Sequence, residues 1–384
     1  MPFSSNEIIT SSKLSSSPTS EKDKPAPKTS VVNSVLPWKT KWKPAPEDIK
    51  NWNRFLSTNS EEMSKSLQFS FNDLKLRGFA GHTSAIRTFG INESANIFGS
   101  GSRDRSVKLW SLDVYRGIEN WKTDSYSECL ISYNGHRRTN ISDVHFITGG
   151  GSSSTSDIVA SCDGQVHLWE PETAKTLHQF NTGKANMVSI SPIFRSRCLV
   201  GGNNDGTIVT LDCKTHSALH SWKSSSGNSG VLRVVAVNAA ETLIAVGFSS
   251  GVISLIESRT GSLVATWKGG DSEVTNMKFH SNELLVTCAP ADHTVCFWNV
   301  SRLALVKTVP VQNDFISLDL FKDEIIAINS NNSVSFTPLN EDFQPYTSKF
   351  KGSIFKSQIT SFGVVPVNQL LLFGCGEGEI YLYA

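Results

Sequence analysis

Short stretches in which hydrophobic and polar residues alternate predict β-strands in this chain, starting near residue 67. There Leu67, Phe69 and Phe71 alternate with polar residues, which is the period of a strand with one buried face. Other expected strands end on an aromatic residue, as residues 107–110 do with the sequence Val-Lys-Leu-Trp. The pattern indicates a chain built mainly from short strands.

A different pattern precedes these strands. Ile49, Trp52 and Phe55 lie on one helical stripe, so we expect a short helical lead-in within a linker of residues 36–66. Residues 1–35 are rich in Ser, Lys, Pro and Thr. Such a segment buries too little apolar surface to offset its ordering entropy, so we expect it to form a disordered tail.

One unit of sequence recurs along residues 67–384. Its most complete copies combine a Gly-His dipeptide, two strands, an Asp in a tight turn and a third strand that ends in Trp. The turn positions of the copies lie 39 to 59 residues apart; all but the first spacing, which is 59, are close to the ~40–45 residues of a propeller blade. These turn positions are Asp104, Asp163, Asp205, Ser250, Asp292, Asn331 and Glu377. The sequence therefore predicts an all-β fold, a seven-bladed WD-repeat β-propeller with a disordered N-terminal tail and a short helical lead-in.

The seventh repeat needs a strand from elsewhere in the chain. The sequence stops directly after the third strand of that repeat, which leaves the sheet with an exposed edge. Residues 68–80 have the composition of an outer strand. We predict that they pair with the C-terminal blade and close the ring.

The histidine, serine, aspartate and tryptophan of a full repeat predict a buried hydrogen-bonded cluster that ties the outer loop of a blade to its inner turn. A Ser-His-Asp triad is the alternative reading, but the serine lies inside a strand, without a strained elbow or an oxyanion hole. We therefore expect no catalytic residues and no enzyme activity. The expected cluster residues are His82, Asp104, Trp110, His136, Asp163, Trp169, Asp205, Asp292 and Trp298.

Composition narrows the classes of function. Lys and Arg number 36 against 35 Asp and Glu, so no overall charge favours nucleic acid. Seven cysteines without a CxxC pair indicate free thiols, and the nine histidines lack metal-ligand spacing, so we expect no metal or other cofactor. No apolar run approaches the ~18 residues of a membrane span, and the N-terminus lacks a secretion signal. We expect a soluble, intracellular protein.

Two sets of residues are candidates for partner binding. Arg103 and Arg105 flank the Asp turn of the first repeat, and Arg137 and Arg138 follow the Gly-His of the second. These four arginines are expected on one rim, where planar donors suit desolvated contacts, with solvated loop charges as the alternative.

The second set is Trp38 and Trp42, which are interleaved with lysines. This composition suits a membrane interface or the groove of a partner, and the alternative, which we favour, is that both side chains dock on the propeller wall.

Several segments resemble the C-terminal propeller of the WD repeat-containing protein 81 family. The resemblance covers about residues 50–384, and its most specific point is the loss of both Asp and Trp from the fourth repeat. The resembling segments are residues 79–82, 99–110, 159–171, 245–251, 259–261 and 350–352.

The resemblance implies a cytoplasmic, non-enzymatic adaptor that is peripheral on early and late endosomes. Members of that family work with a companion WD-repeat protein to restrain the Beclin-containing class III phosphatidylinositol 3-kinase complex. This lowers phosphatidylinositol 3-phosphate and promotes early-to-late endosome conversion, and contact with the endosomal membrane is expected to be indirect. Larger relatives carry a BEACH domain ahead of the propeller, whereas a short polar tail stands here, so we expect a short form whose missing regions are absent or supplied in trans.

Two alternatives stay open beside this adaptor. The first is a propeller that binds phosphoinositides directly, although the Phe-Arg-Arg-Gly loop of such propellers is absent here. The second is an adaptor in an unrelated pathway, such as a substrate receptor of a ubiquitin ligase.

Overall fold

The fold is known from a computed structural model that describes most of the chain after residue 70. The expected disordered tail, the helical lead-in, and Trp38 and Trp42 all lie outside the described residues. The described residues are 71, 73–92, 94, 96–112, 126–147, 157–181, 185–223, 229–311, 315–321, 324–338, 345–350, 355–366 and 369–384.

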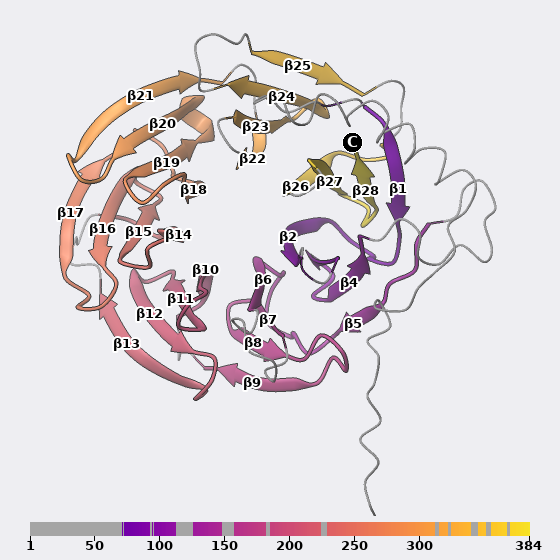
Figure 1. The fold of residues 1–384 in the computed structure, drawn as a ribbon, viewed down its shortest axis with the longest axis horizontal. Coiled ribbons are helices and arrows are strands. Elements are labelled where there is room, and N and C mark those ends of the chain that lie inside the picture. The colour runs from indigo at the N-terminus through magenta and orange to yellow at the C-terminus, as the bar shows by residue number, and fades with distance from the viewer. Residues whose placement is uncertain are drawn as a thin grey trace, which may run out of the picture. The chain divides into compact units, whose positions relative to one another are not determined.

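The described residues form seven four-stranded antiparallel sheets, arranged around a central axis like the blades of a propeller (Figure 1). The predicted seven-bladed propeller is thereby confirmed. In six sheets the four strands follow one another in sequence, from an inner strand to an outer strand. The first three sheets contain β2 (Ile86–Asn92), β3 (Ile97–Ser102), β4 (Val107–Ser111) and β5 (Ile131–Tyr133); β6 (Asp143–Ile147), β7 (Ile158–Cys162), β8 (Val166–Trp169) and β9 (Thr176–Phe180); and β10 (Met187–Ile193), β11 (Cys198–Asn203), β12 (Thr207–Asp212) and β13 (Ser217–Lys223).

The next three sheets repeat the same order, and a short 3-10 helix, η3 (Pro290–Asp292), forms the turn inside the fifth. Their strands are β14 (Leu232–Val237), β15 (Leu243–Phe248), β16 (Val252–Glu257) and β17 (Leu263–Lys268); β18 (Asn276–Phe279), β19 (Leu284–Ala289), β20 (Thr294–Asn299) and β21 (Ala304–Pro310); and β22 (Phe315–Phe321), β23 (Glu324–Asn329), β24 (Ser333–Pro338) and β25 (Tyr346–Lys349).

The seventh sheet takes its outer strand from the N-terminal side of the ring. It runs β26 (Ile359–Val365), β27 (Leu370–Cys375), β28 (Ile380–Tyr383) and then β1 (Lys75–Phe79). β1 pairs antiparallel with β28, with Phe79 opposite Ile380. Leu74 and Ala384 exchange two further backbone hydrogen bonds, of 3.3 and 3.0 Å. Chain segments about 300 residues apart thus complete one sheet, and β1 lies inside the 68–80 segment to which the composition pointed.

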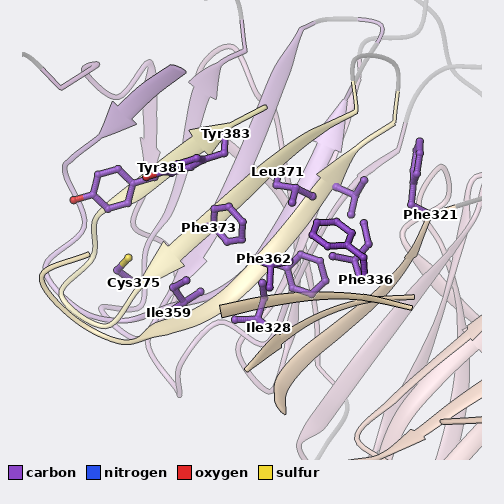
Figure 2. Packing of buried hydrophobic residues seen from close by; sticks show 13 residues of the cluster. Phe321, Ile328, Phe336, Ile359, Phe362, Leu371, Phe373, Cys375, Tyr381 and Tyr383 are labelled. Atoms are coloured by element: carbon purple, nitrogen blue, oxygen red, sulfur yellow. The ribbon is translucent and has the colours of Figure 1, made fainter. Parts of the chain in front are cut away.

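Hydrophobic side chains fill the spaces between neighbouring sheets. Because each sheet packs against one sheet on either side, the second strands β3, β11, β23 and β27 are buried along their whole length. Figure 2 shows one such layer, in which Ile328 and Phe336 of the sixth sheet meet Phe362 and Phe373 of the seventh. Burial of each large side chain of this kind contributes about 1.5–3 kcal/mol. The layers hold the ring together from within.

Antiparallel connections sort the loops between two rims. The turns between the second and third strands lie on the same rim as the loops that lead from one blade to the next, and we name it the Asp-turn rim because Asp104, Asp163, Asp205 and Asp292 lie there. The remaining hairpin turns lie on the opposite rim. The candidate arginines belong to loops of the Asp-turn rim.

Replacing Phe79 tests how far closure by β1 supports the fold. Its side chain is fully buried, and its ring lies 5.0 Å from that of Phe98 and 5.6 Å from that of Trp110, both in the first sheet. We expect Phe79→Ala to lower the free energy of unfolding by about 3–5 kcal/mol, measured by urea denaturation. Phe194→Ala, at a phenylalanine that is 57% exposed in a turn, is the matched control and should cost less than about 0.5 kcal/mol. Equal losses would show that the packing of β1 matters little to the ring.

Candidate functional site

A chain of hydrogen bonds crosses the first blade from its turn to its third strand. Asp104 in the turn accepts from His82 Nδ1 at 2.8 Å. His82 Nε2 lies 2.7 Å from the Ser100 hydroxyl, which also accepts from the Trp110 indole N–H at 2.8 Å. The His82, Ser100 and Trp110 side chains are buried, so the loop before β2, the strand β3 and the strand β4 are tied together in an apolar surrounding.

Asp104 also organises the loops around it. Its carboxylate accepts from the Thr83 amide at 3.0 Å and from the amide and hydroxyl of Ser106 at 2.9 and 2.6 Å. Burial raises the pKa of this carboxyl, but the hydrogen bonds from His82 and Ser106 outweigh burial and hold the pKa well below its ordinary value of 3.8. Asp104 is therefore an ionised anchor for the turn.

The second blade contains the same set with one difference in geometry. His136 Nε2 lies 2.7 Å from the Ser161 hydroxyl, and Trp169 Nε1 donates to that hydroxyl at 3.0 Å. The distance from His136 Nδ1 to Asp163 Oδ2 is 3.3 Å, longer than the equivalent distance in the first blade. As at Asp104, burial raises the pKa of Asp163, yet hydrogen bonds hold it below the ordinary value.

Two residues that the sequence reading did not select join this second cluster. His167 Nδ1 lies 2.8 Å from the hydroxyl of Tyr133, whose ring stacks on Trp169 at 4.7 Å. A Cβ on Gly135 would lie 2.3 Å from that hydroxyl, which explains why glycine precedes His136. Burial is the main reason that the pKa of His167 falls to about 4. The sequence contains one signal for this larger cluster. His167 stands four residues after the turn aspartate, where the first blade has Lys108.

The fifth blade has only part of this arrangement. Asp292 accepts from the amides of Asp271 and Ser272 at 3.0 and 3.1 Å. Trp298 Nε1 donates to the Thr287 hydroxyl at 2.9 Å. Because this blade has Gly269-Gly270 where the full repeats have Gly-His, no histidine joins Asp292 to Trp298.

Other blades use smaller polar groups. The exposed Asp205 accepts from the Thr207 amide in its own turn at 3.0 Å, and among the described residues it is not joined to a histidine or tryptophan cluster. In the fourth blade, the Ser250 hydroxyl donates to the Ser229 carbonyl at 2.6 Å. In the sixth, Asn332 accepts from the Ile359 amide of the seventh sheet at 2.8 Å. The turn-to-loop contact thus persists in weaker forms.

The four candidate arginines are all exposed on the Asp-turn rim of the first two blades. The amides of Arg137 and Arg138 donate to Asp163 at 3.0 and 2.9 Å. The Arg103 amide donates to the Ala85 carbonyl at 2.8 Å. Hydrogen bonds therefore hold the backbone at Arg103, Arg137 and Arg138, while the side chains are exposed.

Comparison with known proteins agrees with this geometry. The family model "WD domain, G-beta repeat" matches residues 74–111, 127–170 and 261–299, which include the two full clusters and the first three strands of the fifth blade. WD repeat-containing protein 81 of Rattus norvegicus and of Homo sapiens is 27% identical over 342 residues, 87% of this chain. This chain is a WD-repeat propeller that is similar to part of WD repeat-containing protein 81. Propellers of this kind are typical of non-enzymatic scaffolds.

The similarity covers only a small part of each relative's length. The chain spans 17% of the length of WD repeat-containing protein 81. Suppressor of organelle fusion 2 of Caenorhabditis elegans is 24% identical over 324 residues, 82% of this chain and 22% of that protein. The likeness therefore concerns the propeller. Within the part of this chain that the structure describes, no helix has the length and apolarity needed to cross a membrane.

Replacing an aspartate of the buried cluster should lower the free energy of unfolding far more than replacing an exposed turn aspartate. We expect Asp104→Ala to lower the free energy of unfolding by about 2–4 kcal/mol, because His82 and two amides lose their acceptor in a buried site. Asp205→Ala should cost about 0.5 kcal/mol, since only the exposed turn amide of Thr207 loses its partner. Urea denaturation of the two variants decides the matter, and similar losses would argue against a special role for the cluster.

The depressed carboxyl pKa values also predict a pH dependence. Because folding lowers the pKa of Asp104 and Asp163, their ionised forms stabilise the fold fully above about pH 4, the unfolded-state value, and less as the pH falls below it. We therefore expect the stability gap between the wild type and an Asp104→Asn, Asp163→Asn double variant to narrow between pH 5 and pH 2.5 in denaturation titrations run at roughly half-unit steps. A gap that stays constant across this range would contradict the assignment.

Proposed function

We propose that this propeller is a protein-docking adaptor in the control of endosomal phosphatidylinositol 3-phosphate. With a companion WD-repeat protein it would restrain the Beclin-containing class III phosphatidylinositol 3-kinase complex and so promote early-to-late endosome conversion. In this proposal the chain acts in the cytoplasm, peripheral on early and late endosomes, and its membrane contact is indirect. The observation that carries the proposal is the relation to WD repeat-containing protein 81 across 87% of the chain.

A second relative supports a role in membrane traffic. The protein from Caenorhabditis elegans carries the name Suppressor of organelle fusion 2, which places that protein in the control of fusion between organelles. A smaller amount of phosphatidylinositol 3-phosphate in early endosomal membranes would fit a role in controlling fusion between organelles. The propeller shared by these proteins is the part through which we expect partners to be held.

The Asp-turn rim of the first two blades is the surface that we propose for docking. Arg103, Arg105, Arg137 and Arg138 are exposed there, in a chain whose charges nearly balance. Their loops are already ordered by the buried clusters, so a partner would order only side chains on binding. Planar guanidinium groups pair well with carboxylates, so an acidic segment of the companion protein or of the kinase complex is the expected ligand.

Charge reversal of these four arginines tests the proposal. The combined variant Arg103→Glu, Arg105→Glu, Arg137→Glu, Arg138→Glu should reduce co-purification of the companion protein or kinase subunits at least about tenfold, because like charges would face an acidic partner. In cells that lack the wild-type protein, it should also fail to restore normal early endosome size. The melting temperature should change little, because all four side chains are exposed.

A matched control reverses the same amount of charge on the opposite rim. Arg195, Lys214, Arg259 and Arg302 are exposed in hairpin turns there, and their replacement by Glu should leave partner binding and endosome size unchanged. If the first variant still binds and rescues, the docking surface lies elsewhere. If the purified wild-type chain sediments with vesicles that contain phosphatidylinositol 3-phosphate and not with plain phosphatidylcholine vesicles, direct lipid binding replaces the indirect contact.

A further inference from the structure

One difference between the clusters of the two full blades lies four residues after the turn aspartate. In the first blade this is Lys108, whose ammonium group donates to the Ser132 hydroxyl at 3.0 Å. In the second blade it is His167, whose ring stacks on His136 with centroids 4.1 Å apart. A buried second histidine thus lies inside a cluster that elsewhere contains one.

This second histidine coincides with a changed contact at the first. His82 Nδ1 lies 2.8 Å from its aspartate in the first blade, whereas His136 Nδ1 lies 3.3 Å from Asp163 and lacks a hydrogen-bond partner. His167 Nε2 lies 3.9 Å from the other oxygen of Asp163. Two ring nitrogens and a carboxylate therefore converge within 4.8 Å of one another, in side chains that are almost fully buried.

The outward-facing nitrogens of both rings are held by hydroxyl groups. His136 Nε2 lies 2.7 Å from the Ser161 hydroxyl, and His167 Nδ1 lies 2.8 Å from the Tyr133 hydroxyl. When these nitrogens carry the protons, the lone pairs of His136 Nδ1 and His167 Nε2 face Asp163. An N–H that is bound on the outer side, with a lone pair turned inward, is the arrangement of metal-binding histidines.

We propose that His136, Asp163 and His167 bind a divalent transition-metal ion of the zinc class. Two imidazoles and one carboxylate are a ligand set that zinc accepts, with the fourth position left for water. Neighbouring ligands of tetrahedral zinc lie about 3.4 Å apart at its usual bond lengths of about 2.0–2.1 Å. The observed separations of 3.3 and 3.9 Å, which run to different oxygens of Asp163, are close to this. Because the two ring planes lie only 29° apart, one imidazole must turn about its Cβ–Cγ bond before both lone pairs point at one ion.

The surroundings of the three ligands suit such a site. The amides of Arg137 and Arg138 fix Asp163 Oδ2, and the amide of Gln165 donates to Asp163 Oδ1 at 3.2 Å. The Arg138 guanidinium donates to Asn186 in the third blade, at 3.4 Å. A bound ion would tie the loop before β6, the β7–β8 turn and β8 together. This structural role is independent of the proposed adaptor function.

Zinc content of the purified full chain tests the site. Protein made in zinc-supplemented medium, purified without chelator and dialysed should contain about one zinc ion per chain by elemental mass spectrometry. His167→Lys gives the second blade the residue that the first blade has, and it should lose that ion. Cobalt substitution should give visible absorption bands of a four-coordinate ion in the wild type and not in the variant.

Stability gives a second readout and a control. Zinc at about a hundredfold excess over its Kd should raise the Tm of the metal-free wild type by about 3 °C and leave that of His167→Lys unchanged. His178 and His216 form a stacked pair at 5.0 Å that could bind zinc adventitiously, so His178→Gln, His216→Gln is the matched control and should keep the ion.

Three outcomes would overturn the proposal. Wild-type protein could contain no more zinc than His167→Lys, the zinc could disappear with the His178 and His216 replacements, or the cobalt spectrum could be that of a six-coordinate surface ion. If His167→Lys fails to fold, His167→Gln takes its place, since it keeps a neutral polar side chain of similar size. Loss of partner binding in the arginine variant has no bearing on these results.

Discussion

The pairing of β1 with β28 is the interaction on which the remaining structure depends. A propeller sheet with an unpaired outer edge exposes backbone donors and acceptors, and a ring with a loose blade can open between its inner strands. Here the last blade is completed by a segment from the start of the ring, and Phe79 of that segment packs on Phe98 and Trp110 of the first sheet. One strand therefore supplies both the missing backbone partners and the apolar contact between the last blade and the first.

Within the closed ring, ionised aspartates fix the loops of the Asp-turn rim. Asp104 and Asp163 each gather amides from two loops, and their buried histidine partners connect them to the tryptophan of the third strand. Where the aspartate is replaced, the polar side chain makes fewer contacts: Ser250 donates to the Ser229 carbonyl, and Asn331 accepts from Ser333 in its own turn. The loops of the first two blades are thus the most strongly held, and they carry the arginines of the proposed docking surface.

Ordered loops with exposed cationic side chains are a suitable basis for an adaptor. The backbone amides of Arg137 and Arg138 donate to Asp163, so the partner does not have to set the loop conformation. The proposed ion at His136, Asp163 and His167 would strengthen the same region, because Tyr133 from the first sheet already holds one of its ligands. Partner binding and metal binding would then share a scaffold without sharing atoms.

The sequence by itself determined the number of blades, the type of each strand and the identity of the full repeats. The strands follow from the alternation of hydrophobic and polar residues within each stretch of about 40 residues. The number of blades follows from the recurrence of such stretches along the chain. The composition of residues 68–80 likewise pointed to the edge that β1 occupies, because an outer strand was missing from the last repeat. The tryptophans Trp38 and Trp42 and the expected lead-in lie outside the described residues, so they stay predictions.

Only the tertiary structure decided which polar residues meet. Asp205 fits the repeat pattern yet remains an exposed turn residue, because no histidine is placed opposite it in the described part of the third blade. His136 and His167 are 31 residues apart and looked unrelated by ligand spacing, but the loop before β6 lies against β8 and stacks their rings. Tyr133 reaches them from the neighbouring blade. Spacing along the chain reports on neighbours within one element, whereas the contacts of this cluster are set by how two sheets pack.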